Sequence, residues 1–149
     1  MAARVHHSAI VVHDVETSLR FYRDGIGLEV LMDHVFEGDW PTLFDASSTT
    51  LRSIFLGDRR NPDAGIVELV VLDRPAPGEP SSPTGAGFFL LSFFVDVDEV
   101  LERLTVLGYG PARRIEQPAP TGPVAMATLR DPDGVRIELV GVSAEVTGR

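Results

Sequence analysis

The chain has 149 residues and a mass of 16.2 kDa, and hydrophobic residues make up 44% of it and charged residues 23%. This length and composition fit one compact domain, or two small halves that share a core, and exclude a largely disordered protein. The net charge of −9 argues against DNA or RNA as a partner, and the absence of cysteine excludes disulfides and thiolate ligands, so that a metal would need His, Asp or Glu.

The first half of the chain predicts a strand, a helix and three further strands. Residues 5–12 are apolar and β-branched, and Asp14 can cap a helix over residues 15–24. Three more apolar stretches are expected to form strands, at residues 29–36, 51–57 and 66–73. Residues 4–73 are therefore predicted to form a first βαβββ module.

A proline-rich linker, residues 74–86, is expected after the first module. Residues 74–83 contain four of the 11 prolines, and each proline lacks the backbone N–H that a helix or an inner strand needs.

The sequence gives no sign of a membrane segment. Apolar stretches fall short of the roughly 18 residues that a membrane span needs, and the first residues lack the apolar core of a signal peptide. We therefore expect a cytoplasmic protein without a membrane partner.

The second half, residues 87–142, predicts the same order of elements. Asp96 and Glu99 have the spacing of a capping box, and an apolar stripe at helical spacing follows and ends at Gly108. Strands are expected at residues 112–116, 124–130 and 135–142, and residues 131–134 have the composition of a tight turn between the last two.

The two halves also resemble each other in sequence. Residues 61–70 align without a gap on residues 131–140, and five of the ten positions are identical, with Glu68 and Glu138 among them. Residues 8–13 align more weakly on residues 91–96, and each of these stretches precedes an amphipathic run. The order of elements is therefore repeated.

Glu68 and Glu138 stand in apolar strands, where a carboxylate is costly to desolvate. The run around Glu68 is apolar on both strand faces, which suggests a strand that is covered on both sides. Each glutamate would then need a partner or a wet cavity. A simpler interpretation is that each points to solvent at a sheet edge or pairs with an arginine such as Arg136. The matching repeat positions favour a shared function.

His7 stands at the start of the first predicted strand. Two βαβββ halves that pair into one curved sheet would bring their first and last strands together, so that His7, Glu68 and Glu138 line one cavity. One imidazole and two carboxylates suit a divalent ion with open positions, such as iron(II), manganese, nickel or zinc. The alternative is an exposed polar histidine, and His6 is expected to face the other way.

Two segments together resemble the vicinal oxygen chelate superfamily, which includes glyoxalase I, extradiol dioxygenases and bleomycin-binding proteins. These are residues 7–28 and the Asp-Pro-Asp-Gly turn with its following strand, residues 131–140. The resemblance covers residues 4–142 and implies an α+β fold, in which two βαβββ modules of one domain form an open cup-shaped mixed sheet. It also implies a homodimer.

The resemblance further implies metal ligands from the first and last strands of each module, at the positions of His7, Glu68, Leu90 and Glu138. Leucine cannot bind a metal, so this set departs from the four ligands of glyoxalase I and from the two His of ring-cleaving dioxygenases. We expect a metal-dependent enzyme, a lyase or isomerase of the glyoxalase type or a dioxygenase-like protein, that binds a substrate with adjacent oxygens. Glu68 or Glu138 would act as the base.

The substrate pocket is predicted from an irregular aromatic stretch and two arginines. Phe36, Trp40 and Phe44 would form its walls, although core packing or a dimer contact would explain them equally. Arg52 and Arg113 could bind a substrate carboxylate, although arginines at such positions are commonly solvated.

The rival function is a binding protein without catalysis, similar to the members that sequester antibiotics. Leu90 in a ligand position, the single Trp and the negative charge fit the binding of a flat or cationic drug.

Overall fold

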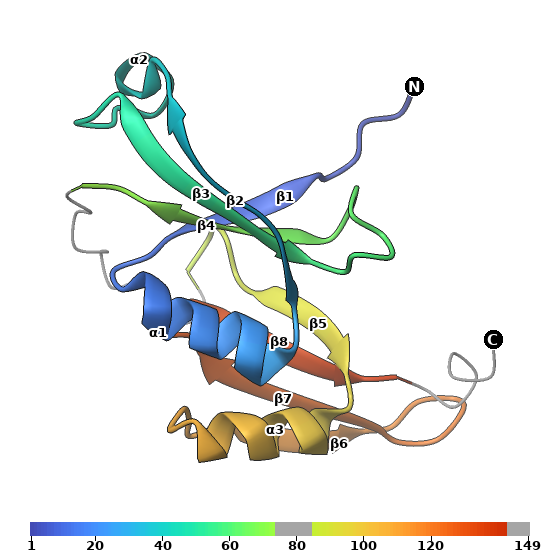
Figure 1. Cartoon of the computed structure of the whole chain (residues 1–149). Helices are drawn as coiled ribbons and strands as arrows, with labels where there is room; N and C mark the ends of the chain where they lie inside the picture. The colour runs from blue at the N-terminus through green and yellow to red at the C-terminus, as the bar shows by residue number, and fades with distance from the viewer. Residues whose placement is uncertain (74–84, 143–149) are drawn as a thin grey trace. The chain divides into compact units, whose positions relative to one another are not determined.

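The computed structural model describes residues 1–73 and 85–142, so most of the predicted linker lies outside the described residues. The chain divides into two compact units, of which one contains β1 to β4 and the other β5 to β8. Each unit has its own four-stranded mixed sheet, and the strands and helices follow the predicted βαβββ order twice (Figure 1). The two predicted modules are confirmed.

The first sheet has the strand order β1-β4-β3-β2. Its strands are β1 (His7–Val11), β2 (Glu29–Glu37), β3 (Thr50–Gly57) and β4 (Ile66–Val71). β1 and β4 run parallel, and the other neighbours run antiparallel. A parallel neighbour needs a crossover, which the helical segment between β1 and β2 provides.

The crossover begins as the short helix α1 (Val15–Leu19) and continues as the π-helical segment η1 (Arg20–Ile26). Asp14 caps it as predicted, because its Oδ1 accepts a hydrogen bond from the backbone N–H of Thr17 at 3.0 Å. That hydrogen bond lowers the pKa of Asp14. The apolar side of the first unit is buried here, with Ile10, Leu19, Phe21, Ile54, Leu56, Val67 and Leu69 all below a tenth exposed.

The second sheet repeats this topology with the strand order β5-β8-β7-β6. Its strands are β5 (Leu91–Val95), β6 (Arg113–Gln117), β7 (Val124–Arg130) and β8 (Arg136–Gly141). The crossover helix is α3 (Val97–Val106), which Asp96 caps through the backbone N–H of Glu99 at 3.1 Å. Helix α3 contacts β7 and β8 through a buried stripe at helical spacing, formed by Val97, Val100 and Leu104.

The turn between β7 and β8 is built on Asp131, which is 5% exposed. Its Oδ1 accepts hydrogen bonds from the backbone N–H groups of Asp133 and Val135, both at 2.8 Å. Gly134 adopts a φ of 85°, a left-handed conformation that favours glycine. The predicted turn is confirmed, and it fixes where β8 begins.

Besides the π-helical continuation of α1, the segment after β2 departs from the sequence prediction. The irregular stretch after β2 contains a short helix, α2 (Trp40–Phe44), capped by Asp39, which accepts a hydrogen bond from the N–H of Thr42. None of the helices within the described residues is long and apolar enough to cross a membrane.

Candidate functional site

Glu68 lies on the face of the first sheet that is opposite the buried apolar side. Its strand neighbours Val67 and Leu69 point into the core and are at most 3% exposed. The Glu68 side chain is 14% exposed, and residues directly opposite it on adjacent strands, Ala9 and Phe55, share its face. The carboxylate is therefore held on the sheet surface and does not enter the apolar core.

Two side chains hold the Glu68 carboxylate. His7 places its Nε2 atom 3.1 Å from Oε2, and Ser53 donates its hydroxyl to Oε1 at 2.7 Å. Ser53 is 3% exposed, whereas the His7 side chain is 38% exposed and lies 5.4 Å from the Phe55 ring, centroid to centroid. The buried hydroxyl thus orients one carboxylate oxygen, and the other oxygen and the imidazole remain at the surface.

His6 does not face away from His7, which corrects the sequence prediction. The Nδ1 atoms of the two rings are 2.9 Å apart, and the rings meet edge to face. The prediction failed because β1 begins at His7, so strand alternation does not extend to His6. His6 thus contacts the Nδ1 atom of the His7 ring, and the Nε2 atom of the same ring lies beside Glu68.

The His7 and Glu68 donor atoms fit a divalent ion. Metal bonds of roughly 2.0–2.2 Å at angles of 90–109° separate neighbouring donor atoms by about 3.0–3.5 Å. The observed separation of 3.1 Å between Nε2 and Oε2 lies within that range. Within either unit, the described residues contain no third His, Asp or Glu close enough to complete a set of three. The first unit therefore supplies two donors.

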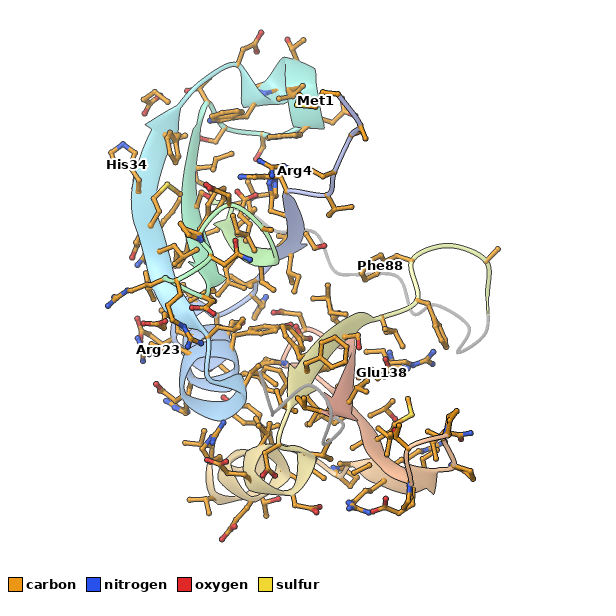
Figure 2. The ribbon with its side chains drawn as sticks, turned by 90° about the vertical axis from the view of Figure 1, so that its right-hand side faces the viewer. Met1, Arg4, Arg23, His34, Phe88 and Glu138 are labelled. Atoms are coloured by element: carbon orange, nitrogen blue, oxygen red, sulfur yellow. The ribbon has the colours of Figure 1, made fainter. Side chains whose placement is uncertain are left out.

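Glu138 occupies the equivalent position on the second sheet, on β8 (Figure 2). It is partly buried between the core residues Ile137 and Leu139, both fully buried. Its Oε1 accepts a hydrogen bond from the Ser92 hydroxyl at 2.8 Å. Each of the two repeated glutamates is thus paired with a serine hydroxyl, but Ser53 is buried and Ser92 is exposed.

Glu138 lines a hollow of about 660 Å³ in the second unit. Leu90 and Arg113, two of the predicted pocket residues, line the same hollow, together with Arg130 and Arg136. Arg136 also lies over the Phe89 ring, with the guanidinium carbon 4.3 Å from the ring centroid. The structure therefore brings three predicted site residues of this unit together and adds two arginines.

The predicted aromatic residues gather at one end of the first sheet. Phe36 is the second-to-last residue of β2 and lies directly opposite Leu51 on β3. Leu51 is on the same face of β3 as Phe55, which lies opposite Glu68, so Phe36 shares the face of Glu68. Trp40 and Phe44 stack at 5.7 Å with ring planes 9° apart, and the Trp40 indole N–H donates to the Phe36 carbonyl at 3.2 Å. Phe44 is 61% exposed, so this stack is not core packing.

Arg52 lies on the opposite face of the first sheet from Glu68. The residue directly opposite Arg52 on β4 is Val71, and Val71 is three residues from Glu68, so the two point to opposite faces of the sheet. The guanidinium forms two hydrogen bonds with the Asp33 carboxylate at 2.9 and 2.7 Å, which lower the pKa of Asp33 and raise that of Arg52. Arg52 therefore does not share a face with the candidate ligands.

Sequence reasoning missed the groups that orient the glutamates, Ser53 and Ser92, and one arginine of the hollow, Arg130. A serine in the middle of a mainly buried strand, two residues from Phe55, which lies opposite Glu68, is the signal that could have identified Ser53. Arg130 follows from the strand register, since it lies directly opposite Arg136.

Comparisons with known proteins agree with this architecture. The Glyoxalase/Bleomycin resistance protein/Dioxygenase superfamily profile matches residues 4–139. A lactoylglutathione lyase-like protein of Aspergillus terreus is 37% identical over 149 aligned residues, covering 91% of this chain and 74% of that protein.

Solved structures share the fold. A glyoxalase-family protein from Bacillus cereus superposes with a TM-score of 0.74 at 20% identity, covering 95% of both chains. TnmS3, an antibiotic binding protein from Streptomyces sp. CB03234, superposes with a TM-score of 0.56 at 25% identity, covering 95% of this chain and 98% of that one.

Proposed function

Because the chain belongs to the Glyoxalase/Bleomycin resistance protein/Dioxygenase superfamily, we propose that it is a divalent-metal-dependent enzyme of the glyoxalase type. Its ligands would be His7, Glu68 and Glu138, and its substrate would present two adjacent oxygens. The metal would be iron, manganese, nickel or zinc, since one imidazole and two carboxylates suit each of them.

The proposal depends most on the pairing of His7 with Glu68. An imidazole nitrogen and a carboxylate oxygen lie 3.1 Å apart, and each has a second group that fixes its orientation, His6 for His7 and Ser53 for Glu68. Metal sites are commonly built with such supporting partners. The same acid-and-hydroxyl pair recurs at Glu138 in the second unit, which supports Glu138 as the third ligand.

The carboxylates would also move the proton in the reaction. A bound divalent ion would supply Lewis-acid stabilisation of the negative charge that develops on the substrate oxygen. Glu138 is the better candidate for the base, because its serine partner is exposed and a hollow large enough for a substrate lies beside it. Glu138 would be the ligand that leaves the metal to act as the base, and it would take the proton from the substrate carbon next to the carbonyl and return it to the same or the adjacent carbon.

Proton exchange in D₂O tests this proposal directly. Hydroxyacetone, a ketone with an adjacent hydroxyl, would exchange its C–H protons faster in the presence of the metal-loaded protein, as followed by NMR. We expect Glu138→Gln to abolish this acceleration at saturating metal. Glu116→Gln is the matched control, because Glu116 is an exposed glutamate on the opposite face of the same sheet.

Two results would contradict the enzymatic proposal. One is exchange at the buffer rate with the metal-loaded wild-type protein. The other is an acceleration that survives both a chelator and Glu138→Gln.

The second candidate function is the sequestration of an antibiotic without catalysis. TnmS3 is described as an antibiotic binding protein. In addition, the resemblance to the superfamily implies a metal ligand at the position of Leu90, and leucine cannot bind a metal. The stacked, partly exposed Trp40 and Phe44 rings would support the binding of a flat molecule. Quenching of Trp40 fluorescence by an aromatic antibiotic, with protein that contains no metal, would favour this function over the enzyme.

A further inference from the structure

The Glu138 face of the second sheet is ordered in three successive rows of side chains. Ser92, Glu138, Thr128 and Arg113 lie directly opposite one another across the four strands and form the middle row. The neighbouring row on one side contains the two arginines Arg130 and Arg136. The neighbouring row on the other side contains only apolar side chains. The sheet surface is therefore polarised along its strands.

The basic half consists of Arg130 and Arg136 together with Arg113 of the middle row, and all three line the hollow beside Glu138. Arg130 and Arg136 are directly opposite each other on antiparallel strands. Guanidinium groups at facing positions can donate together to one oxyanion. Among the described residues, no carboxylate forms an ion pair with Arg113, although the chain carries a net charge of −9. The basic half is thus suited to an anionic group.

The apolar half is the next row on the other side of Glu138. It is formed by Phe94, Val140, Met126 and Ile115, one residue from each strand. Phe94 is 82% exposed and Ile115 is 55% exposed, so large apolar surfaces are open on this face. An apolar body placed here would lie two residues from the candidate base.

The spacing of the rows sets the size of the molecule that fits. Residues two apart in a strand are separated by about 7 Å, so the basic and apolar rows on either side of Glu138 lie about 13 Å apart. This distance matches a small molecule with an acid group at one end and a ring or short chain at the other. Its reactive centre would then lie over Glu138.

From this arrangement, and on the basis of the proposed function, we infer that the substrate is a small amphiphilic acid. Its oxyanion, a carboxylate or a phosphate, binds Arg113, Arg130 and Arg136, and its apolar body packs on Ile115 and Met126, which are directly opposite each other on β6 and β7. Glu138 faces the carbon between these two ends. The selectivity for an acid belongs to the second unit and needs no metal.

The test is a binding measurement with defined probes on the full chain. Mandelate has a carboxylate, an adjacent hydroxyl and a phenyl ring. 1-Phenylethane-1,2-diol keeps the ring without the charge, lactate keeps the charge without the ring, and phenyl phosphate exchanges the carboxylate for a phosphate. Affinities come from calorimetry, and NMR chemical shifts locate binding on β6, β7 and β8. Metal content is measured on the same samples.

Variants on one strand separate the two halves of the surface. Arg113→Gln is expected to weaken mandelate binding about ten-fold, as loss of one charge-assisted hydrogen bond would. Arg114→Gln is the matched control, because Arg114 is the next residue of β6, faces the other side and pairs with Asp98 and Glu116. Ile115→Thr is expected to weaken binding roughly three- to five-fold through lost apolar contact.

The inference is supported if mandelate or phenyl phosphate binds more tightly than the diol and lactate, and if Arg113→Gln weakens binding while Arg114→Gln does not. The tighter of the two acids identifies the oxyanion. The inference is overturned if no acid binds in the millimolar range, if the diol binds as well as mandelate, or if Ile115→Thr changes only the oligomeric state. Acid binding by metal-free protein upholds this inference and leaves the proposed function open, whereas a protein that binds mandelate but retains none of the proposed metals would uphold this inference and contradict the metal-dependent function.

Discussion

The two serines that orient the repeated glutamates provide a matched test of the site. Ser53 is buried and donates to Glu68 at 2.7 Å, and Ser92 is exposed and donates to Glu138 at 2.8 Å. A hydrogen bond to a charged group contributes roughly 1.5–3 kcal/mol when it is buried, and much less when water can replace the donor. Replacing each serine by alanine should therefore have unequal effects.

For Ser53→Ala, we expect the free energy of unfolding to fall by about 2 kcal/mol, because the Glu68 side chain is only 14% exposed and water cannot fully replace the hydroxyl. For a chain of this length, that corresponds to a Tm lower by about 4–8 °C. Ser92→Ala should cost less than about 0.5 kcal/mol. Urea denaturation followed by circular dichroism measures both values.

The same pair of variants addresses the metal. Loss of a supporting partner typically weakens metal affinity about 10- to 100-fold, so Ser53→Ala should weaken it by at least the lower value. Equal stabilities for Ser53→Ala and Ser92→Ala, together with unchanged metal affinity, would refute the assignment of Ser53 as the group that positions Glu68.

Three further predictions concern other parts of the chain. Hydrogen bonds from Arg52 keep the pKa of Asp33 below 3.8 in the folded protein. The carboxylate therefore stabilises the fold above about pH 4, and this stabilisation should vanish as the pH falls below the folded pKa. Urea titrations of the wild type and Asp33→Asn across this pH range measure the difference. Asp131→Ala leaves two backbone N–H groups of the β7–β8 turn without their acceptor and should cost about 2–3 kcal/mol in the same assay, whereas Asp131→Asn, which keeps a carbonyl oxygen, should cost less. Leu90→His supplies an imidazole beside Glu138 and should raise zinc affinity about ten-fold or more in calorimetric titrations, and an unchanged affinity would exclude Leu90 from the ligand positions.

The fold could be predicted because its signals are local. The caps Asp14 and Asp96 and the turn at Asp131 mark helix starts and a strand connection by residue type and spacing, and the structure uses each of them in that way. The π-helical continuation of α1 and the short helix at Trp40 have no comparable signal in the sequence. Their backbone conformation depends on packing, which composition and periodicity do not specify.

The site was only partly predictable, because strand register decides which side chains meet. The apolar run around Glu68 predicted a strand but did not show which of its faces is buried, and it could not reveal that Arg52 falls on the face opposite Glu68. Ser53 and Arg130 became visible only once the pairing of β3 with β4 and of β7 with β8 was known. A shift of the strand register by one residue would move every side chain of that strand to the other face of the sheet.

The central claim is that His7, Glu68 and Glu138 together bind a catalytic divalent ion, and metal stoichiometry tests it most directly. Wild-type protein dialysed against zinc, nickel, manganese or iron(II) should retain about one ion per chain for at least one metal. His7→Ala, Glu68→Gln and Glu138→Gln should each lose that ion without loss of fold, and Glu116→Gln should retain it. A wild-type protein that retains none of the four metals, or a Glu138→Gln variant with undiminished metal content, would contradict the claim.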